Sequence, residues 1–215
     1  MGPLRLAVLC GLYFLLPVLC SAGSFFTGVF RSDGDVQYFS LVVSANSTIS
    51  VVSLGYGGSA SPSVPAGGFA TSLALYDNFG NQLAHDFVGG TAVGSVCSNG
   101  TNQDPTTGFC EDATLSFPAL AGSYTLTLSE QGNDGPDPLS SGFPLAPGTI
   151  NPGGPFLDPG FPGLLQRTGN WALDVTVNGS ITEISATPEP ATWMLLGIGL
   201  CLAGACWRRK LIPAK

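Results

Sequence analysis

The sequence predicts an all-β domain made of two packed antiparallel sheets. Apolar and polar residues alternate along several segments of the chain, and no apolar pattern of helical period lies between its two terminal segments. The 30 glycines and 17 prolines among 215 residues supply frequent turns between those segments. Because a strand with one apolar face must bury that face against another layer, this pattern favours a two-sheet sandwich.

Three segments show the alternation most clearly. In the segment 123–129, Tyr124, Leu126 and Leu128 alternate with hydroxyl-bearing residues, and the segments 35–43 and 171–177 follow the same period of two. The weaker segments bring the prediction to about nine strands; they are 25–31, 48–54, 71–76, 82–87, 113–117 and 181–184.

Two stretches rich in glycine, proline and serine interrupt the strands, at 55–68 and at 131–168. A connection as long as the second is either mobile or functional. We expect the segment 131–168 to lie over the sandwich.

The N-terminal residues predict a signal peptide. Arg5 precedes an apolar run over 6–19, and small residues stand three positions and one position before a cut after Ala22. Lipidation of Cys20 is the weaker alternative, because Leu19 occupies the place of a small residue. We therefore assign residues 1–22 to the signal peptide and 23–186 to an exported domain.

The C-terminal residues predict a membrane anchor. The uncharged stretch 191–207 is at the short end of what crosses a bilayer, with tryptophans near both ends and a basic cluster behind it. A buried core helix is the alternative, but an all-apolar helix needs more surrounding protein than this chain offers.

Two short motifs flank this stretch. They are Pro188, Glu189 and Pro190 before it, and Arg208, Arg209 and Lys210 after it. Together with the apolar stretch they resemble the PEP-CTERM sorting signal of Gram-negative bacteria. The resemblance covers 187–215 and implies recognition and cleavage by an exosortase, then delivery to the cell surface or extracellular matrix, with a role in biofilm exopolysaccharide. GPI and sortase signals fit less well.

Four segments of the body carry a second resemblance; they are 33–39, 73–80, 120–127 and 167–171. These segments are similar to bacterial pre-peptidase C-terminal domains, in particular to the variant found in PEP-CTERM proteins. This resemblance implies a jelly-roll-like sandwich that serves as an accessory or adhesion module without chemistry of its own.

The net charge of the predicted exported domain limits the classes of molecule that it can bind. Between residues 23 and 187, Arg31 and Arg167 are the only basic residues, against thirteen acidic ones, so this part carries a net charge of −11. Such a body cannot neutralise a row of phosphates, and we expect no nucleic-acid partner.

Four aspartates could form a calcium site if their strand ends converge. Asp33 and Asp35 flank a glycine at a strand entrance, and Asp77 and Asp86 stand at the two ends of a predicted hairpin. Ordinary turn chemistry is the alternative, since turns favour the same residues. The sequence implies no other cofactor.

Cysteines and histidine point away from catalysis. Cys97 and Cys110 are the only cysteines of the exported body, which predicts a disulfide. His85 is the single histidine, and no nucleophile motif accompanies it. We therefore expect a non-catalytic protein. A glycan- or protein-binding module is the alternative, and glycan hydrolysis by two distant carboxylates remains a third hypothesis.

Overall fold

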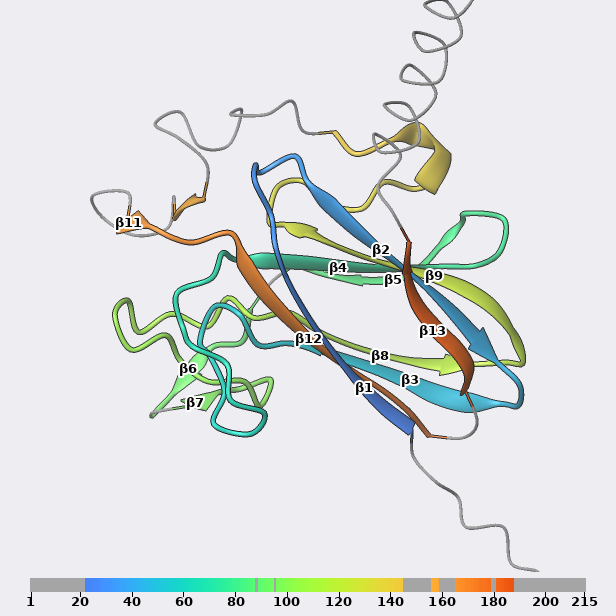
Figure 1. Ribbon diagram of the computed structural model, residues 1–215, viewed down its shortest axis with the longest axis horizontal. Helices are drawn as coiled ribbons and strands as arrows, with labels where there is room; N and C mark the ends of the chain where they lie inside the picture. Colours follow the sequence, from blue (N-terminus) through green and yellow to red (C-terminus); the bar gives the residue numbers. More distant parts are fainter. Residues whose placement is uncertain are drawn as a thin grey trace, which may run out of the picture.

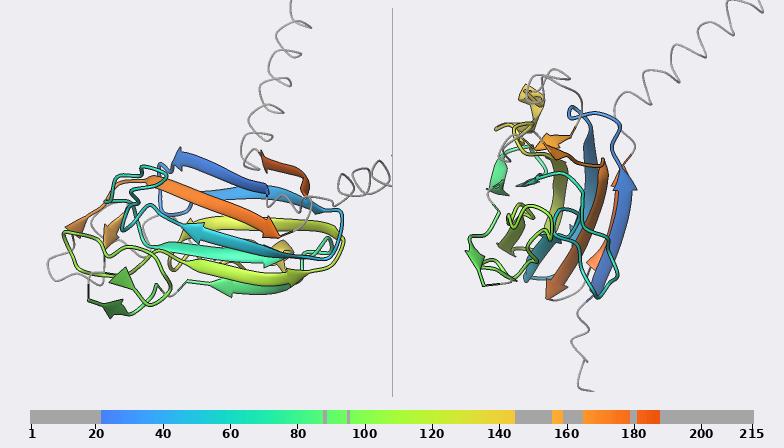
Figure 2. Two further views of the ribbon diagram at one scale, coloured as in Figure 1. Left: turned by 90° about the horizontal axis from the view of Figure 1, so that it is seen from below. Right: turned by 90° about the vertical axis from the view of Figure 1, so that its left-hand side faces the viewer.

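The computed structural model describes residues 22–87, 89–94, 96–144, 156–158, 165–178 and 181–187. Within these residues the chain forms thirteen strands and one short 3-10 helix, Leu139–Ser141, but no α-helix. Two large sheets face each other across one core (Figure 2). The predicted all-β sandwich architecture is confirmed.

Both large sheets are antiparallel throughout. Sheet A has four strands, in the spatial order β1 (Ala22–Val29), β12 (Asn170–Asn178), β3 (Ser47–Ser53) and β8 (Thr114–Ala119). Sheet B has five strands, in the order β13 (Ile181–Thr187), β2 (Val36–Val43), β9 (Gly122–Glu130), β4 (Thr71–Tyr76) and β5 (Gln82–Asp86).

Each of the nine predicted segments corresponds to one of these strands. The first begins earlier than expected, at Ala22, because Ala22 pairs with Val177 of β12. Two small ladders were not predicted, since they are too short to show a period. They are β6 (Ala92–Val93) with β7 (Val96–Cys97), and β10 (Leu157–Asp158) with β11 (Leu165–Gln166).

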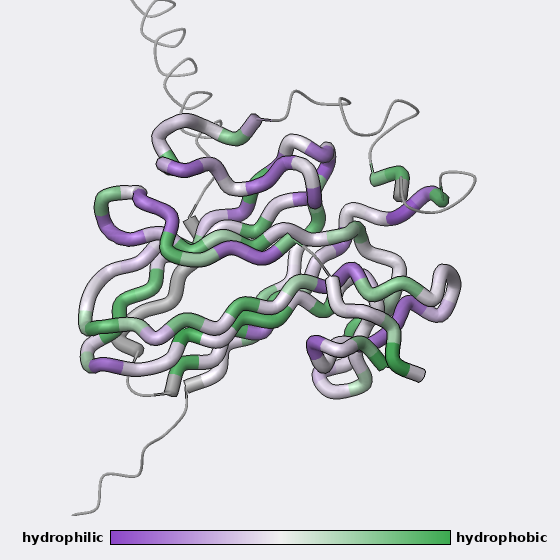
Figure 3. Tube along the Cα trace, turned by 180° about the vertical axis from the view of Figure 1, so that it is seen from behind, coloured by the Kyte–Doolittle hydropathy of each residue, from purple (hydrophilic) through white to green (hydrophobic). Residues whose placement is uncertain are grey.

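The core follows from the period of two. In β2, Phe39, Leu41 and Val43 are buried and point toward sheet A, while the residues between them are partly exposed. Apolar and polar residues alternate in the same way along other strands (Figure 3). Trp171 closes the core beside the Phe39 ring, at a centroid distance of 6.0 Å. Its indole lies over Gly28 of β1, where any side chain would overlap the ring.

The connections differ sharply between the two ends of the sandwich. Short connections, such as 77–81 and 120–121, lie at one end. The long ones, 54–70, 87–113 and 131–169, all start and end at the other, which is on the left in Figure 1. We call this second end the loop-bearing end. In sandwich proteins, binding residues concentrate on loops that a rigid scaffold holds in this way.

Residues 131–144 cover the outer face of sheet B. Ser129 donates a hydrogen bond to the carbonyl of Asn133 (2.7 Å), and the Leu139 N–H donates one to the carbonyl of Gly80 (2.8 Å). Gly135 lies so close to Tyr76 that a side chain there would overlap its hydroxyl. This cover explains why every residue of β4 is buried, on both faces of the sheet.

The predicted terminal segments lie outside the described residues, apart from Ala22 and Thr187. No helix in the described part of the chain is long and apolar enough to cross a bilayer, and the predicted span 191–207 is not among those residues. Strand β13 ends at Thr187, directly before the first residue of the Pro-Glu-Pro sequence.

Candidate functional site

A buried ion pair holds the loop-bearing end together. The Arg167 guanidinium donates to the Asp104 carboxylate at 2.9 Å, and the two side chains are only 3% and 1% exposed. Arg167 comes from the connection 131–169 and Asp104 from the connection 87–113. Two long loops are therefore tied by one charge pair.

Arg167 also reaches the third long loop. Its Nε donates to the carbonyl of Gly68 (2.8 Å) and its guanidinium to the carbonyl of Tyr56 (3.1 Å), while its Cζ lies 4.0 Å from the centre of the Tyr56 ring. A cation over an aromatic face adds attraction in a desolvated place. Arg167 thus connects all three long loops.

The surroundings of Asp104 stabilise its charged form. Burial alone would raise the pKa of this carboxyl, but the hydrogen bond and charge of Arg167, with the N–H groups of Thr107 and Thr106, outweigh burial and lower the pKa. The Asp104 carboxyl is therefore ionised over the whole neutral range.

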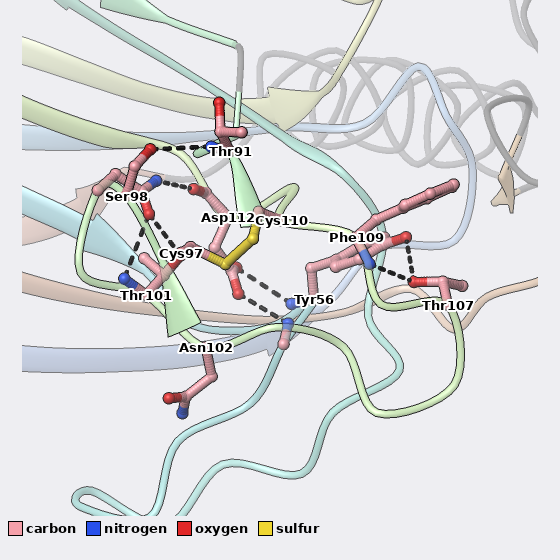
Figure 4. The surroundings of a disulfide bond; sticks show 12 residues. Tyr56, Thr91, Cys97, Ser98, Thr101, Asn102, Thr107, Phe109, Cys110 and Asp112 are labelled. Carbon is pink, nitrogen blue, oxygen red and sulfur yellow. Dashed lines mark hydrogen bonds between the residues drawn. A yellow bond between two sulfur atoms is a disulfide. The ribbon is translucent and has the colours of Figure 1, made fainter. Parts of the chain in front are cut away.

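The predicted disulfide between Cys97 and Cys110 is formed, and it closes a loop within the connection 87–113 (Figure 4). Asp104 lies inside that loop. The disulfide and the ion pair consequently fix the same segment from two sides.

Asp112, two residues after Cys110, is a second buried carboxylate of the loop-bearing end. It accepts a hydrogen bond from the Ser53 hydroxyl (2.9 Å) and one from the N–H group of Gly57 (2.8 Å). A further bond comes from the N–H group of Tyr56 (3.1 Å) (Figure 4). Burial raises the pKa of Asp112, although these hydrogen bonds oppose the rise. Because Tyr56 and Gly57 lie at the start of the connection 54–70, these bonds hold the base of that loop in place.

The four aspartates proposed as a calcium site do not form one cluster. Asp33 accepts from the Phe156 N–H (2.7 Å), Asp35 from the Ser32 hydroxyl (2.9 Å) and Asp86 from the Thr114 N–H (2.7 Å). Asp33 and Asp35 share the connection 30–35 at the loop-bearing end, and Asp86 is the last residue of β5 at the same end, while Asp77 lies at the opposite end. Among the residues that the structure describes, no group of three or more acidic, histidine or cysteine side chains is placed to hold a metal ion.

Asp77 serves the turn that joins β4 and β5. Its carboxylate accepts from the Asn81 side-chain amide (2.8 Å) and from the N–H groups of Phe79 (2.8 Å) and Asn81 (2.9 Å). The Asn81 amide, with these N–H groups, lowers the pKa of Asp77. This is the turn chemistry that stood as the alternative to calcium.

A cavity of about 520 Å³ opens at the loop-bearing end. It lies where β4 begins and where β5 and β9 end, beneath the segment 156–157. Its polar wall carries three carboxyl groups and its apolar wall three phenyl rings. The residues that decide its chemistry are Glu111, Glu130, Asp134, Phe69, Phe87 and Phe156.

The apolar wall is rigidly held. The Phe156 ring stacks on Phe69, which in turn stacks on Phe30, at centroid distances of 5.3 and 5.2 Å. The backbone of Phe156 is bonded on both sides, to the Asp33 carboxylate through its N–H and to the Arg167 N–H through its carbonyl (2.8 Å). These bonds maintain a φ of 58°, a conformation that side-chain-bearing residues adopt rarely.

Sequence reasoning did not assign a role to Arg167, Asp104 or Asp112. Two signals pointed to Arg167: it is one of two basic residues in an acidic body, and it begins the segment 167–171 that carries a family resemblance. Its actual partner depends on how loops far apart in sequence meet, which no local pattern records.

The described body is thus a disulfide-linked all-β sandwich with its long loops gathered at one end. A family model described as the PEP-CTERM protein-sorting motif matches residues 186–210, which include all six residues assigned to the sorting signal. No curated protein matches the chain. The motif implies export, a membrane-anchored precursor and processing by an exosortase.

Proposed function

We propose that this chain is a non-catalytic surface or matrix protein, whose sandwich is displayed and then released through the C-terminal sorting signal. The observation that carries the proposal is the motif match at 186–210, which begins inside the last strand, β13. A sorting signal that follows a folded body directly is what we expect when the folded body is the part to be delivered.

The body suits an extracellular location in two further respects. Its disulfide is of the kind that persists in oxidising compartments outside the cytoplasm. Its strong negative charge favours solubility and disfavours association with other acidic polymers. A contribution to the matrix that surrounds the cells, including its exopolysaccharide, is the role that we propose for the released form.

We further propose that the sandwich is a jelly-roll-like accessory module, similar to pre-peptidase C-terminal domains. The strand order supports this proposal, because successive strands mostly alternate between sheets A and B and pair with partners distant in sequence. In such a fold two four-stranded sheets enclose the core. Here β13 adds a further strand at one edge of sheet B.

The positions of the buried charges support a non-catalytic role. Asp104 is held by Arg167, and Asp112 by hydroxyl and N–H groups of the protein itself. His85 is exposed and stacks on Phe87 at a centroid distance of 5.5 Å. Calcium is not part of this proposal, because each of the four aspartates has a separate structural role.

The test is processing of the C-terminus in cells. We expect a Gram-negative host with an exosortase to trim the chain near residues 188–190. A variant with Pro188→Ala, Glu189→Ala and Pro190→Ala should keep its full C-terminus in the membrane fraction. Intact-mass spectrometry of the purified protein distinguishes the two.

A Pro213→Ala variant is the matched control, because it changes a proline of the same tail beyond the matched motif. It should be trimmed like the natural chain. Retention of residues 191–215 by the natural chain in the exosortase-containing host would overturn the proposal.

A glycan-binding module is the second candidate function, and the cavity at the loop-bearing end favours it. Phenyl rings beside carboxylates are a combination that binds polar ligands with an apolar face. This role is compatible with display at the surface.

A further inference from the structure

Strand β1 forms one edge of sheet A and has a backbone partner on one side only. It pairs with β12 over eight consecutive residues, Ala22–Val29, without a register shift. Its other side has no hydrogen-bonded neighbour within the described part of the chain, and Figure 2 shows β1 at the outer margin of the sandwich. An edge of this kind exposes a row of N–H and C=O groups that can pair with another strand.

The other three edges of the two large sheets carry features that oppose such pairing. Strand β8 contains Pro118, which has no N–H group to donate. Strand β13 has a register shift between Ile181 and Glu183 and bears the charge of Glu183. Strand β5 pairs with β4 through a shifted register and bears Asp86. Strand β1 has no charged residue, no proline and no bulge, so among these described edges it is the one open to a further strand.

The side chains around this edge are apolar or hydroxyl-bearing. Alternate residues of β1 point away from the core, and two of them are large and apolar: Phe25 is 42% exposed and Val29 68%. Thr27 lies between them and is also exposed. Asp174 is the only charged residue in the four strands of sheet A, although residues 23–187 carry a net charge of −11. The edge therefore offers nothing to attract a charged partner, and it favours an uncharged, apolar strand.

A second copy of the chain presents a strand with these properties. Two β1 strands can pair antiparallel about a twofold axis, because such an axis sets the same residues of both copies against each other and pairs the open groups of both. An antiparallel pair forms about one backbone hydrogen bond per residue. The two sheets would then continue as one sheet, with four strands from each copy.

Charge repulsion between the copies is weak at this edge. Asp174 lies on β12, opposite Phe25 and one strand inside the edge. In two copies joined at β1, three strand spacings of about 4.8 Å would hold the two Asp174 residues at least about 14 Å apart. This separation exceeds the screening length of about 8 Å at physiological ionic strength.

We propose that two copies of this chain form a symmetric dimer by antiparallel pairing of their β1 strands. Phe25 and Val29 of each copy would lie beside the outward side chains of the other copy's β1. The two loop-bearing ends would point in opposite directions, because the paired strands are antiparallel. The proposal rests neither on the sorting signal nor on the cavity, so its failure leaves the proposed function standing.

The test measures the oligomeric state of the full-length chain in mild detergent by sedimentation equilibrium. We expect the natural chain to change from monomer to dimer between about 1 µM and about 200 µM, where small interfaces associate. Thr27→Glu should weaken dimerisation by at least about tenfold, because pairing would strip water from the new charge. Ser116→Glu is the matched control and should leave the dimer unchanged, since it makes the same kind of change at an exposed residue of β8, the opposite edge of the same sheet.

Two further variants separate edge pairing from other causes of association. Thr27→Lys should also weaken dimerisation, whereas long-range attraction to an acidic body would strengthen it. Phe25→Ser should weaken dimerisation by about tenfold, and Phe79→Ser, which removes an exposed phenyl ring from the β4–β5 turn, should not. Unchanged thermal unfolding of these variants would show that each still folds.

Hydrogen exchange of the natural chain measures the pairing without a substitution. Protection of residues 23–29 should rise with protein concentration, while that of residues 114–119 should not. Equal protection of 23–29 at low and high concentration would overturn the proposal, as would a natural chain that stays monomeric up to about 200 µM. A dimer that Thr27→Glu and Phe25→Ser leave unchanged would also overturn it, and would assign association to another surface or to the C-terminal tail.

Discussion

Individual residues hold the long loops together at the loop-bearing end, and Arg167 makes the most such contacts. Arg167 makes an ion pair, two hydrogen bonds to carbonyl groups and a ring contact, and each reaches a segment distant in sequence. A buried ion pair is not in itself a strong source of stability, because both charges lose their water. Removing one member is costly, because the other is then buried without its counter-charge.

We therefore expect Asp104→Asn to lower the free energy of unfolding by about 3–5 kcal/mol. The substitution keeps the oxygen that accepts from the N–H groups of Thr106 and Thr107 but places a neutral amide against Arg167. Urea unfolding of the full-length chain at pH 7 measures the loss. Asp174→Asn is the control and should change little, and an equal effect of both would contradict the assignment.

The ion pair between Arg167 and Asp104 also predicts that the free energy of unfolding depends on pH. Because the folded-state pKa of Asp104 is lowered, its stabilising effect is fully present above its ordinary value of 3.8 and is lost as the pH falls through the lower folded value. The difference between the natural chain and Asp104→Asn should thus shrink below pH 3.8. The raised pKa of Asp112 acts in the opposite sense, since ionisation of that carboxyl costs stability as the pH rises.

At the scale of elements, the strands and the presence of a long segment over the sandwich were predictable, but the contacts that the loops make were not. The period of two in residues such as Tyr124, Leu126 and Leu128 reflects burial of one face, and that requirement is local. The contacts of the cover over sheet B follow instead from Gly135 lying against Tyr76 of β4 and from Leu139 bonding to Gly80 of the β4–β5 turn, both distant in sequence. No sequence period records such meetings.

For the aspartates, too, the local element was predictable and the distances between side chains were not. The hairpin β4–β5 was predicted, and with it the placement of Asp77 at the turn. Asp86 pairs with Leu73, several residues along the ladder from that turn, so the length of the hairpin separates the two carboxylates. Turn composition suggested a metal site because turns and calcium loops use the same residues.

The contact between β1 and β12 supplies a prediction at this scale. Gly28→Ala should destabilise the sandwich by about 1–3 kcal/mol, because the new methyl group would overlap the rigid indole of Trp171. Thermal unfolding monitored by circular dichroism measures it.

Gly23→Ala in the same strand is the matched control, since its new methyl group would meet only the Thr176 hydroxyl at an ordinary 3.7 Å. Equal melting temperatures for the two variants would show that the Trp171 contact does not depend on glycine.

For the whole molecule, the disulfide matters because it lies where the long loops gather. It joins residues 13 positions apart in a segment that also contains Asp104. The sequence was enough to predict it, because only two of the six cysteines lie between the predicted signal peptide and the predicted anchor. The relation of this loop to the cavity required the structure.

We expect Cys97→Ser with Cys110→Ser to lower the free energy of unfolding by about 3 kcal/mol, the value for a closed loop of this length. Urea unfolding should give the same midpoint for this variant as for the natural chain in a reducing agent. Cys201→Ser with Cys206→Ser in the C-terminal tail is the control. A natural chain that reductant does not weaken would contradict the prediction.

The position at which β13 ends has a consequence for release of the body from its anchor. In the part of the chain that the structure describes, the pairing between β13 and β2 extends to Thr187, so a cut after residue 188 would leave all of these described pairs in place. The tethered precursor and the freed body would then share one set of pairings. Release of the body from the membrane would then require no refolding. A ligand bound at the loop-bearing end before the cut would stay bound to the released protein.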